Sequence, residues 1–383
     1  MAADDARLEG ACAGPPLKVL TLRHPGGATP ILIGPGALAA AAERLGPWLA
    51  GRTAFVVTTP RVLALHGERL AWVGERAARR VTLEVPEGEA AKTPAEAGAL
   101  WRAMLDAGGR RDSRVIAFGG GSAGDLAGFA AGCFLRGVEV VQAPTTLLAQ
   151  VDASIGGKTG VDLPAGKNAV GLFHHPAAVV ADTAVLATLP RRELAAGLVE
   201  VVKMALVLDP ELFARVEAGL DALLAADPEA LAPVVAAAAA AKAAVVERDP
   251  AETSGERRVL NLGHTLGHAL EAALGYRGLR HGEAVAYGLL FALRLARVRG
   301  LDPAVAARVR ALLARLDLPA LPADAAGLGP DALLGFVRRD KKAGEGGVAW
   351  VLPAALGRFE ITREIGEDEV RRELTAFLAD PWG

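Results

Sequence analysis

The chain has 383 residues, of which 52% are hydrophobic and 22% are charged, a balance typical of a folded globular protein. Its formal net charge of −2 excludes a general attraction to nucleic acid or to an anionic membrane surface. Two cysteines, Cys12 and Cys133, give no disulfide framework, and no uncharged apolar run is long enough to predict a membrane span. The first residues also lack the basic and apolar regions of a signal peptide. We therefore expect a cytoplasmic protein that binds neither nucleic acid nor a membrane.

The first half of the chain follows a tail, residues 1–16, that we expect to be flexible, and it alternates strand-like and helix-like segments. Short apolar runs predict strands over Leu17–Leu22, Ala54–Thr58, Val81–Val85, Val115–Phe118 and Val138–Gln142. Amphipathic stretches predict helices over Gly36–Leu45, Pro94–Asp106 and Asp125–Leu135. Strands separated by helices indicate an α/β domain with a mostly parallel sheet, which we assign to residues 17–189.

From Pro190 onward the pattern changes to long helices. They are predicted over Arg191–Val207, Pro210–Ala225, Pro228–Glu247, His264–Leu274, Gly282–Arg299, Ala304–Leu316 and Pro330–Arg338. Only Val348–Pro353 and Phe359–Thr362 look like strands in this half. The sequence thus predicts an all-α second domain over residues 190–383.

A glycine-rich turn follows the strand predicted over Val115–Phe118. The segment 119–124 satisfies G-x-G-x-x-G, and backbone amides at the start of the next helix can bind a pyrophosphate. Such turns also occur for packing alone, so the motif leaves dinucleotide binding open. A second segment, 156–159, resembles the end of a P-loop, but Asp152 stands where that motif requires glycine, which argues against a nucleoside triphosphatase.

Polar groups are dense between Asp152 and Asn168, where Lys158 and Lys167 lie among four glycines. The glycines make a stable helix unfavourable, so we predict a loop. A loop with an acid, lysines and an amide suits an anionic ligand rich in hydroxyl groups, although a solvated surface loop would have the same composition.

Three of the 7 histidines lie close together in the sequence, at His264, His268 and His281. His264 and His268 share one face of the predicted helix, and a turn separates them from His281. Imidazoles and a carboxylate such as Glu200 suit a borderline metal ion such as Zn²⁺. Thr265 excludes the His-Glu-x-x-His motif of zincins, and the lack of nearby thiolates argues against a structural zinc site. We therefore predict an open, catalytic metal site.

Six sequence blocks together resemble the 3-dehydroquinate synthase family, and the resemblance covers about residues 17–378. The blocks are GGGSAGDLAGF, RGVEVVQAPTTLLAQVDASIGGKTGVDLPAGKNAVGLF, LPRRELAAGLVEVVK, LNLGHTLGHALEA, HGEAVAYG and RDKKAGEGGVAWVLP. The resemblance implies an NAD-binding α/β domain joined to a helical metal-binding domain, with the metal and the substrate in the cleft between them. It also implies a homodimer.

The resemblance assigns a role to each of several residues. It makes Glu200, His264 and His281 the ligands of one divalent ion, Zn²⁺ or Co²⁺, and places His268 on the substrate side. It places the substrate among Arg136, Asp152, Lys158, Asn168, Lys203, Lys242, Arg257, Asn261, His268 and Lys341. It places NAD among Glu89, Lys92, Gly120, Gly121, Asp125, Thr145, Thr146, Leu148, Thr188 and Glu193, with Lys167 between cofactor and substrate.

The activity that the resemblance implies is the cyclisation of 3-deoxy-D-arabino-heptulosonate 7-phosphate, a sugar phosphate, to 3-dehydroquinate with loss of phosphate, in the shikimate pathway of aromatic amino acid biosynthesis. A transient hydride transfer to NAD⁺ would precede phosphate elimination, and the hydride would return before an intramolecular aldol step. The metal would act as a Lewis acid. The net reaction is not a redox reaction, so the enzyme would be a phosphorus-oxygen lyase.

Three alternatives stay open. Another sugar phosphate cyclase, making a valiolone, an inosose or an amino analogue of dehydroquinate, would share the scaffold. The joint presence of six pocket residues favours a substrate with a carboxylate. These residues are Lys158, Asn168, Lys242, Arg257, Asn261 and His268. They do not distinguish an enzyme that makes dehydroquinate from one that makes its amino analogue. A metal-dependent polyol dehydrogenase of the glycerol dehydrogenase type would produce NADH, and a non-catalytic dinucleotide sensor would not need the metal residues.

Three places depart from the family pattern. In the glycine turn, Ser122-Ala123 replaces a larger apolar pair, which would change the packing only. The strand end at 56–60 lacks the acidic residue that often contacts the adenosine ribose, so NAD would depend more on Glu89 and Lys92. The segment 249–255 is one residue longer than usual, which leaves the role of Glu252 open.

Overall fold

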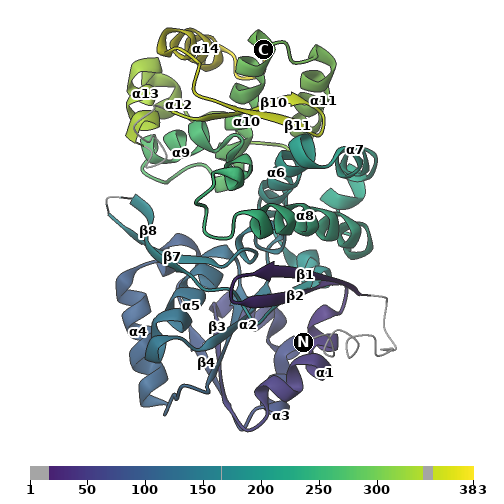
Figure 1. The fold of residues 1–383 in the computed structure, drawn as a ribbon, viewed down its shortest axis with the longest axis vertical. Coiled ribbons are helices and arrows are strands. Elements are labelled where there is room, and N and C mark those ends of the chain that lie inside the picture. Colours follow the sequence, from purple (N-terminus) through teal and green to yellow (C-terminus); the bar gives the residue numbers. More distant parts are fainter. Residues whose placement is uncertain (1–16, 165, 340–347) are drawn as a thin grey trace. The chain divides into compact units, whose positions relative to one another are not determined.

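The computed structural model describes residues 17–164, 166–339 and 348–383, and these form two compact units (Figure 1). The first unit contains the chain up to Leu189 together with Ala225–Pro250, and the second contains Pro190–Leu224 and Ala251–Gly383. The predicted tail over residues 1–16 and the predicted substrate residue Lys341 lie outside the described residues.

A seven-stranded sheet lies at the centre of the first unit, in the order β1-β2-β9-β6-β5-β3-β4. Its strands are β1 (Lys18–His24), β2 (Gly27–Gly34), β3 (Thr53–Thr58), β4 (Arg79–Glu84), β5 (Arg114–Gly119), β6 (Glu139–Pro144) and β9 (Ala178–Asp182). Only β1 and β2 pair antiparallel, as a hairpin, and the remaining pairs are parallel. All six residues of β5 are buried, as expected for a central strand of a parallel sheet. The predicted α/β class is confirmed.

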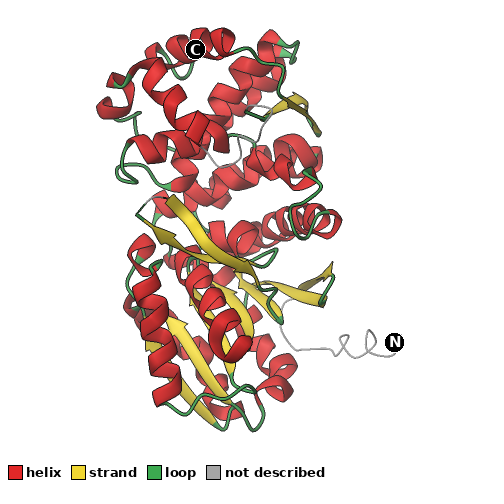
Figure 2. Cartoon of the chain, turned by 60° about the vertical axis from the view of Figure 1, so that its left-hand side comes forward, coloured by secondary structure: helices red, strands yellow, loops and turns green. Residues whose placement is uncertain are grey.

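Helices cover this sheet (Figure 2). The α-helices of the first unit are α1 (Ala37–Leu49), α2 (Pro60–His66), α3 (Ala71–Arg76), α4 (Pro94–Asp106), α5 (Gly121–Cys133) and α8 (Pro228–Arg248). Shorter helical turns are η2 (Gly67–Leu70), η3 (Gly88–Ala91), η4 (Phe134–Arg136), η6 (Thr183–Thr188) and a π-helical turn, η5 (Ala149–Ala153). Helix α5 packs against β5 and β6, and its apolar face joins a core that includes Phe55, Val115 and Leu126.

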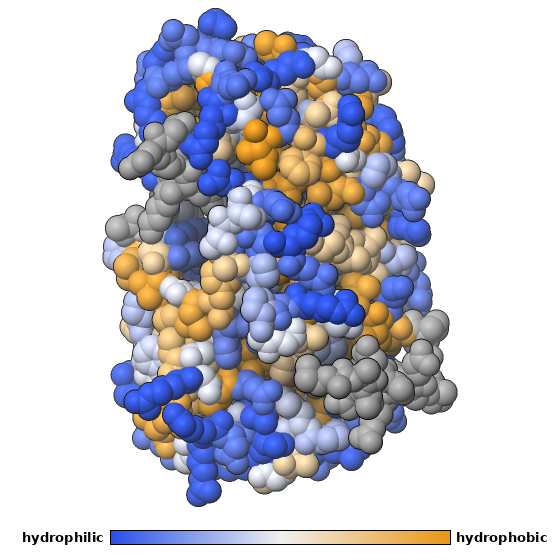
Figure 3. All heavy atoms as spheres, in the orientation of Figure 1, coloured by the Kyte–Doolittle hydropathy of each residue, from blue (hydrophilic) through white to orange (hydrophobic). Residues whose placement is uncertain are grey.

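Most of the segment predicted as a loop, Asp152–Asn168, is not a loop, and this expectation was wrong. The chain forms an antiparallel hairpin of β7 (Lys158–Leu163) and β8 (Gly166–Phe173), in which Gly160 pairs with Gly171. A Cβ at Gly160 would lie 2.8 Å from the carbonyl oxygen of Val170, so the glycine permits a close approach of the strands. Large apolar side chains stay exposed on this hairpin at Leu163, Val170 and Phe173. Hydrophobic side chains accordingly gather at the left edge of Figure 3, where Figure 1 places the hairpin.

Helix α8 belongs to the first unit, which differs from the second domain expected over residues 190–383. It packs against β1, β2, η5 and η6, because its alanine-rich surface lets the helix approach the strands closely. Among the described residues, α8 is the one helix long and apolar enough to cross a membrane by length and composition, and half of its apolar window is buried inside the protein.

The second unit is predominantly helical. Its elements are α6 (Arg191–Leu208), α7 (Pro210–Leu224), η7 (Glu256–Asn261), α9 (His264–Ala273), α10 (His281–Val298), α11 (Pro303–Ala314), α12 (Ala323–Gly327), α13 (Gly329–Arg339), α14 (Glu367–Ala379) and a hairpin of β10 (Trp350–Ala355) and β11 (Arg358–Thr362). Helix α10 packs against both α6 and α9, and it is buried from Gly282 to Ala296. These three helices carry the residues of the metal site that the sequence predicts.

Candidate functional site

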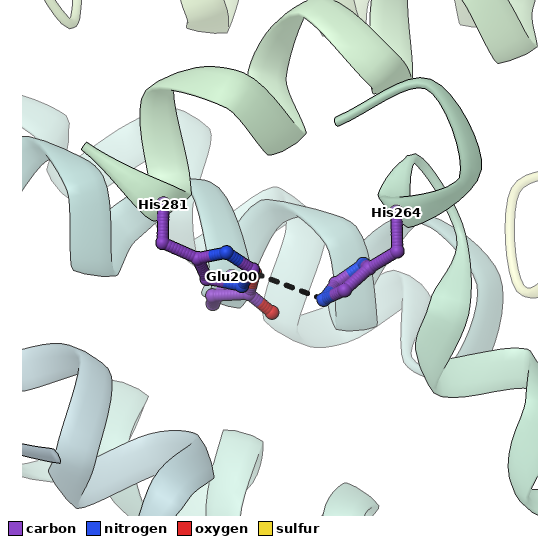
Figure 4. Close-up of side chains that lie close together, drawn as sticks. All are labelled: Glu200, His264 and His281. Carbon is purple, nitrogen blue, oxygen red and sulfur yellow. Dashed lines mark ion pairs between the residues drawn. The ribbon is translucent and has the colours of Figure 1, made fainter. Parts of the chain in front are cut away.

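Glu200, His264 and His281 come together in the second unit, from three different helices. Glu200 lies within α6, while His264 and His281 are the first residues of α9 and α10. One possible ligand atom from each residue lies within 4.8 Å of those of the other two. Figure 4 shows the three side chains pointing toward one another. The arrangement therefore offers two imidazoles and one carboxylate to a single metal ion.

The hydrogen bonds of the two imidazoles determine which ring nitrogen of each can coordinate a metal ion. Nδ1 of His264 lies 3.1 Å from the carbonyl oxygen of Leu262, and Nδ1 of His281 lies 3.1 Å from Oε2 of Glu271. A carbonyl or a carboxylate accepts a hydrogen bond, so Nδ1 carries the proton in each ring and Nε2 carries the lone pair. The Nε2 atoms of His264 and His281 lie 3.8 and 3.7 Å from the same atom, Oε1 of Glu200. Both lone pairs thus converge on one carboxylate.

The carboxylate of Glu200 fits a divalent cation. It is completely buried, and its Oε2 pairs with the ammonium of Lys203, while no donor among the described residues forms a hydrogen bond to Oε1. Lys203 donates a hydrogen bond to the carbonyl oxygen of Leu260, at 2.7 Å. Burial of a carboxylate oxygen without a partner is unfavourable, and a cation coordinated by Oε1, the oxygen nearest both imidazoles, would compensate for it.

Glycines bring the helices of this site close together. A Cβ at Gly282 would overlap the carbonyl oxygen of Ala196 in α6, and a Cβ at Gly288 would overlap that of Gly263. Gly263 itself adopts a φ of 77° just before α9, which favours glycine. The glycines of the sequence blocks around His264 and His281 therefore have a packing role, and they determine the distances among the three helices.

Other predicted site residues of the second unit lie near the predicted metal ligands, Glu200, His264 and His281, in sequence or in space. The ring of His268 lies 5.2 Å from that of His264 and 5.9 Å from that of His281. Arg257, which is buried, and Asn261 lie in η7, directly before α9. Glu193, predicted to contact NAD, lies in the first turn of α6 and forms an ion pair of 2.8 Å with Arg280.

In the first unit, Lys92 connects predicted residues that are distant in sequence. Its Nζ donates to Oδ2 of Asp125 at 2.9 Å and to Oδ1 of Asn168 at 2.6 Å. Burial by itself would lower the pKa of Lys92, but Asp125 and Glu89 outweigh burial and hold this pKa above its ordinary value. Asp162, which the sequence did not single out, accepts a hydrogen bond from the backbone amide of Asn168 at 2.6 Å. The network joins η3, α5 and both strands of the β7–β8 hairpin.

The glycines of the turn have a packing role. A Cβ at Gly120 would lie 3.1 Å from the side chain of Thr146, and one at Gly121 would lie 3.2 Å from Ala153. Thr145 donates its backbone amide to the carbonyl oxygen of Gly119, at 2.9 Å. The turn thus lies beside Thr145 and Thr146, two further residues of the predicted NAD site, while Leu148 directly precedes the π-helical turn.

The remaining predicted residues of the first unit are distributed around this turn and the hairpin. Nζ of Lys242 contacts Oδ1 of Asp152 at 2.5 Å, and Nζ of Lys167 lies 3.8 Å from a carboxylate oxygen of Glu89. Arg136 is the last residue of η4 and has a φ of 70°, and Lys158 is the exposed first residue of β7. The hydroxyl oxygen of Thr188 lies 2.8 Å from Nε2 of the buried His66.

Sequence reasoning missed Glu271 and the pairing of Arg192 with Glu283. Glu271 follows His264 by seven residues and His268 by three, so the helical period would have placed all three on one face. Glu283 accepts hydrogen bonds from Nε and Nη2 of Arg192, at 2.5 and 2.8 Å, but the two residues are too far apart in sequence for any local signal.

Comparisons with known proteins identify the family of the chain. Two family models match the chain: 3-dehydroquinate synthase N-terminal over residues 82–196, and 3-dehydroquinate synthase C-terminal over residues 197–343. The 3-dehydroquinate synthase of Symbiobacterium thermophilum is 48% identical over 330 residues, 85% of this chain and 90% of that relative. That of Xanthomonas oryzae pv. oryzae is 46% identical over 354 residues, 90% of this chain and 94% of that relative.

Solved structures of sugar phosphate cyclases share the fold. The 2-epi-5-epi-valiolone synthase of Streptomyces hygroscopicus, with NAD⁺ and Zn²⁺ bound, is 30% identical with a TM-score of 0.82, covering 91% of this chain and 96% of that one. A 2-deoxy-scyllo-inosose synthase complexed with carbaglucose-6-phosphate, NAD⁺ and Co²⁺ is 25% identical with a TM-score of 0.84, covering 94% and 100%. The fold is that of the sugar phosphate cyclases. Within this class, the chain belongs to the 3-dehydroquinate synthase family.

Proposed function

We propose that this chain converts 3-deoxy-D-arabino-heptulosonate 7-phosphate into 3-dehydroquinate and phosphate, as a phosphorus-oxygen lyase that uses NAD and one divalent ion. Relatives at 44–49% identity over most of the chain are named 3-dehydroquinate synthase. The observation that carries the proposal is the convergence of both imidazole Nε2 atoms on the buried carboxylate of Glu200.

Each of the two units would bind one of the two cofactors. Glu200, His264 and His281 would hold the ion in the second unit, and the glycine turn with Lys92 and Asp125 would hold NAD in the first. When bound, NAD would accept and return a hydride, and the ion would polarise the oxygen of the carbon that is oxidised. This proposal keeps the expected roles of the two domains and counts α8 in the unit that would bind NAD.

The chain's own charged groups would bind the substrate. Lys158, Lys242 and Arg257 would pair with its phosphate and carboxylate, because charge-assisted hydrogen bonds to these anions are strong. Asp152 holds the ammonium of Lys242 in place through a contact of 2.5 Å. His268, next to both imidazoles of the metal site, would hold a proton near the reacting carbons.

The same family resemblance supports a homodimer in the cytoplasm. Sedimentation of the purified protein would test the homodimer, and fractionation of the source cells would test the cytoplasmic location. Neither result bears on the chemistry of the site.

Substrate preference tests the proposed activity. Purified protein supplied with NAD and zinc should release phosphate from the heptulosonate phosphate faster than from sedoheptulose 7-phosphate or glucose 6-phosphate. A preference for sedoheptulose 7-phosphate, which lacks the carboxylate, would instead make the chain a valiolone-type cyclase. The same assay should include the amino analogue of the heptulosonate phosphate, because the pocket residues do not show which of these two substrates the protein prefers.

A control separates substrate binding from cofactor binding. Arg257→Ala should severely impair turnover of the heptulosonate phosphate while leaving metal content and NAD affinity near those of the wild type. Loss of NAD affinity with retained substrate affinity would contradict the placement of Arg257 in the substrate pocket.

A further inference from the structure

Glu271 is a buried carboxylate beside the metal site that the reaction does not use. It lies on α9 with 4% of its surface exposed, and its Oε2 lies 3.1 Å from Nδ1 of His281 on α10. The ring of His281 is thus held between two carboxylates. Its Nδ1 faces Glu271, while its Nε2 lies 3.7 Å from Oε1 of Glu200.

The two imidazoles of the site are restrained in different ways. His264 is held by the carbonyl oxygen of Leu262, two residues before it in the chain, and 10% of its side chain is exposed. His281 begins α10, and 30% of its side chain is exposed. Its Nδ1 depends on a side chain from another helix, so its ring orientation requires Glu271 in a way that the orientation of His264 does not.

Glu271 could in principle be a metal ligand itself, because His268, Glu271 and His281 also form a group with ligand atoms within 4.8 Å. This group and the group containing Glu200 share His281. A ring whose Nδ1–H donates to Glu271 has only the Nε2 lone pair left for a metal. That lone pair faces Glu200, so the hydrogen bond to Glu271 selects one group and disables the other.

We propose that Glu271 is a positioning residue for the metal site: by accepting a hydrogen bond from Nδ1–H of His281, it fixes the tautomer and the direction of the ring, so that the ion binds among Glu200, His264 and His281. Hydrogen bonds of this kind tune metal affinity in many metalloproteins. The inference rests on the proposed metal site and adds a residue to it.

Two variants of similar side-chain size test the inference. Glu271→Gln keeps an acceptor for Nδ1–H, whereas Glu271→Met has no comparable acceptor. Ala273→Ser, on the same helix, serves as the control, and Glu200→Gln serves as the variant that loses a ligand. The affinity of the metal-free proteins for Co²⁺ is measured by competition with a chelator, and the absorption spectrum of the bound Co²⁺ reports its coordination.

The expected pattern separates a positioning residue from a ligand. Glu271→Met should weaken Co²⁺ binding about 10- to 100-fold while still binding one ion, and Glu271→Gln should recover most of the loss. Ala273→Ser should bind as the wild type does. Urea unfolding of the metal-free variants checks that they fold. If Glu271→Met does not fold, comparing Co²⁺ binding by Glu271→Gln and Glu200→Gln still decides whether Glu271 is a ligand or a positioning residue.

Three results would overturn the inference. Co²⁺ binding by Glu271→Met equal to that of the wild type would show that the hydrogen bond has no effect on the ion. Loss of the ion by Glu271→Gln as complete as by Glu200→Gln would make Glu271 a ligand. Failure of the wild-type protein to bind any ion would remove the proposed function as well, which distinguishes the two failures.

Discussion

His264 and His281 begin two different helices, yet their Nε2 atoms lie 3.8 and 3.7 Å from the same carboxylate oxygen of Glu200. Neither ring can turn away without breaking the hydrogen bond of its Nδ1. The directions of both rings are therefore held by hydrogen bonds within the protein, and the geometry of the site depends on how α6, α9 and α10 pack.

The first prediction concerns removal of the metal. Protein treated with a chelator should unfold at a lower temperature than protein saturated with Zn²⁺, because an ion that binds only the native state stabilises it by about 4 kcal/mol at a thousandfold excess over Kd. His264→Ala and His281→Ala should lose this difference. His174→Ala, in the first unit, should keep it, and a zinc-dependent shift that survives in His281→Ala would contradict the assignment.

The second prediction concerns the glycines at the helix crossings. Gly282→Ala should destabilise the second unit by about 1–3 kcal/mol or more, because the added Cβ overlaps the carbonyl oxygen of Ala196. Gly288→Ala should act similarly through Gly263. The control is Gly219→Ala in α7, where a Cβ meets nothing within 4 Å and the change should be stabilising by about 0.4–1 kcal/mol. Equal urea midpoints for Gly282→Ala and Gly219→Ala would refute the crossing argument.

The third prediction concerns Arg192 and Glu283, which join the first turn of α6 to the first turn of α10. The hydrogen bond to Glu283 raises the pKa of Arg192, and Glu283 is buried. Arg192→Met leaves a buried carboxylate without its cation, which should cost about 1–3 kcal/mol, less than a fully buried pair because Arg192 is half-exposed. Glu283→Gln in the Arg192→Met background should recover part of this loss. Additive effects in the double-mutant cycle would show that the pair does not interact.

The fourth prediction concerns pH. Burial lowers the pKa of His66, and Arg69 lowers it further, while Asp182 acts in the opposite direction. A depressed native pKa means that the stability contributed by neutral His66 is present above the unfolded value of about 6.5 and is lost as the pH falls below it. The drop in urea midpoint between about pH 8 and about pH 5.5 should therefore be smaller in His66→Gln than in the wild type. An equal drop in both proteins would show that His66 does not contribute to the pH dependence of stability.

Much of the sheet could be predicted from the sequence, but the hairpins beside it could not. Val115–Phe118 is a continuous apolar run and became the buried strand β5. Strand β2 was missed because Gly27 and Pro30 interrupt its pattern, and the short strand β9 was missed as well. The β7–β8 hairpin was predicted as a loop because glycine is read as a breaker, whereas Gly160 and Gly171 allow the strands to approach.

The metal site was accessible to sequence reasoning only in part. The spacing of His264 and His268 placed both on one helix face, but spacing alone did not separate ligand from neighbour. That distinction came from the family resemblance, and the structure adds that Nε2 of His281 faces Glu200. The partnership of Arg192 with Glu283 joins two helices distant in sequence, so only the fold could reveal it.

The most direct test of the proposed activity is the stoichiometry of the reaction with the heptulosonate phosphate, with NAD supplied far below the substrate concentration. Each substrate molecule consumed should yield one phosphate and one 3-dehydroquinate, identified by NMR, while NADH does not accumulate. Consumption that stops when NAD is exhausted, with NADH formed in equal amount and no phosphate released, would contradict the proposed activity and make the chain a dehydrogenase.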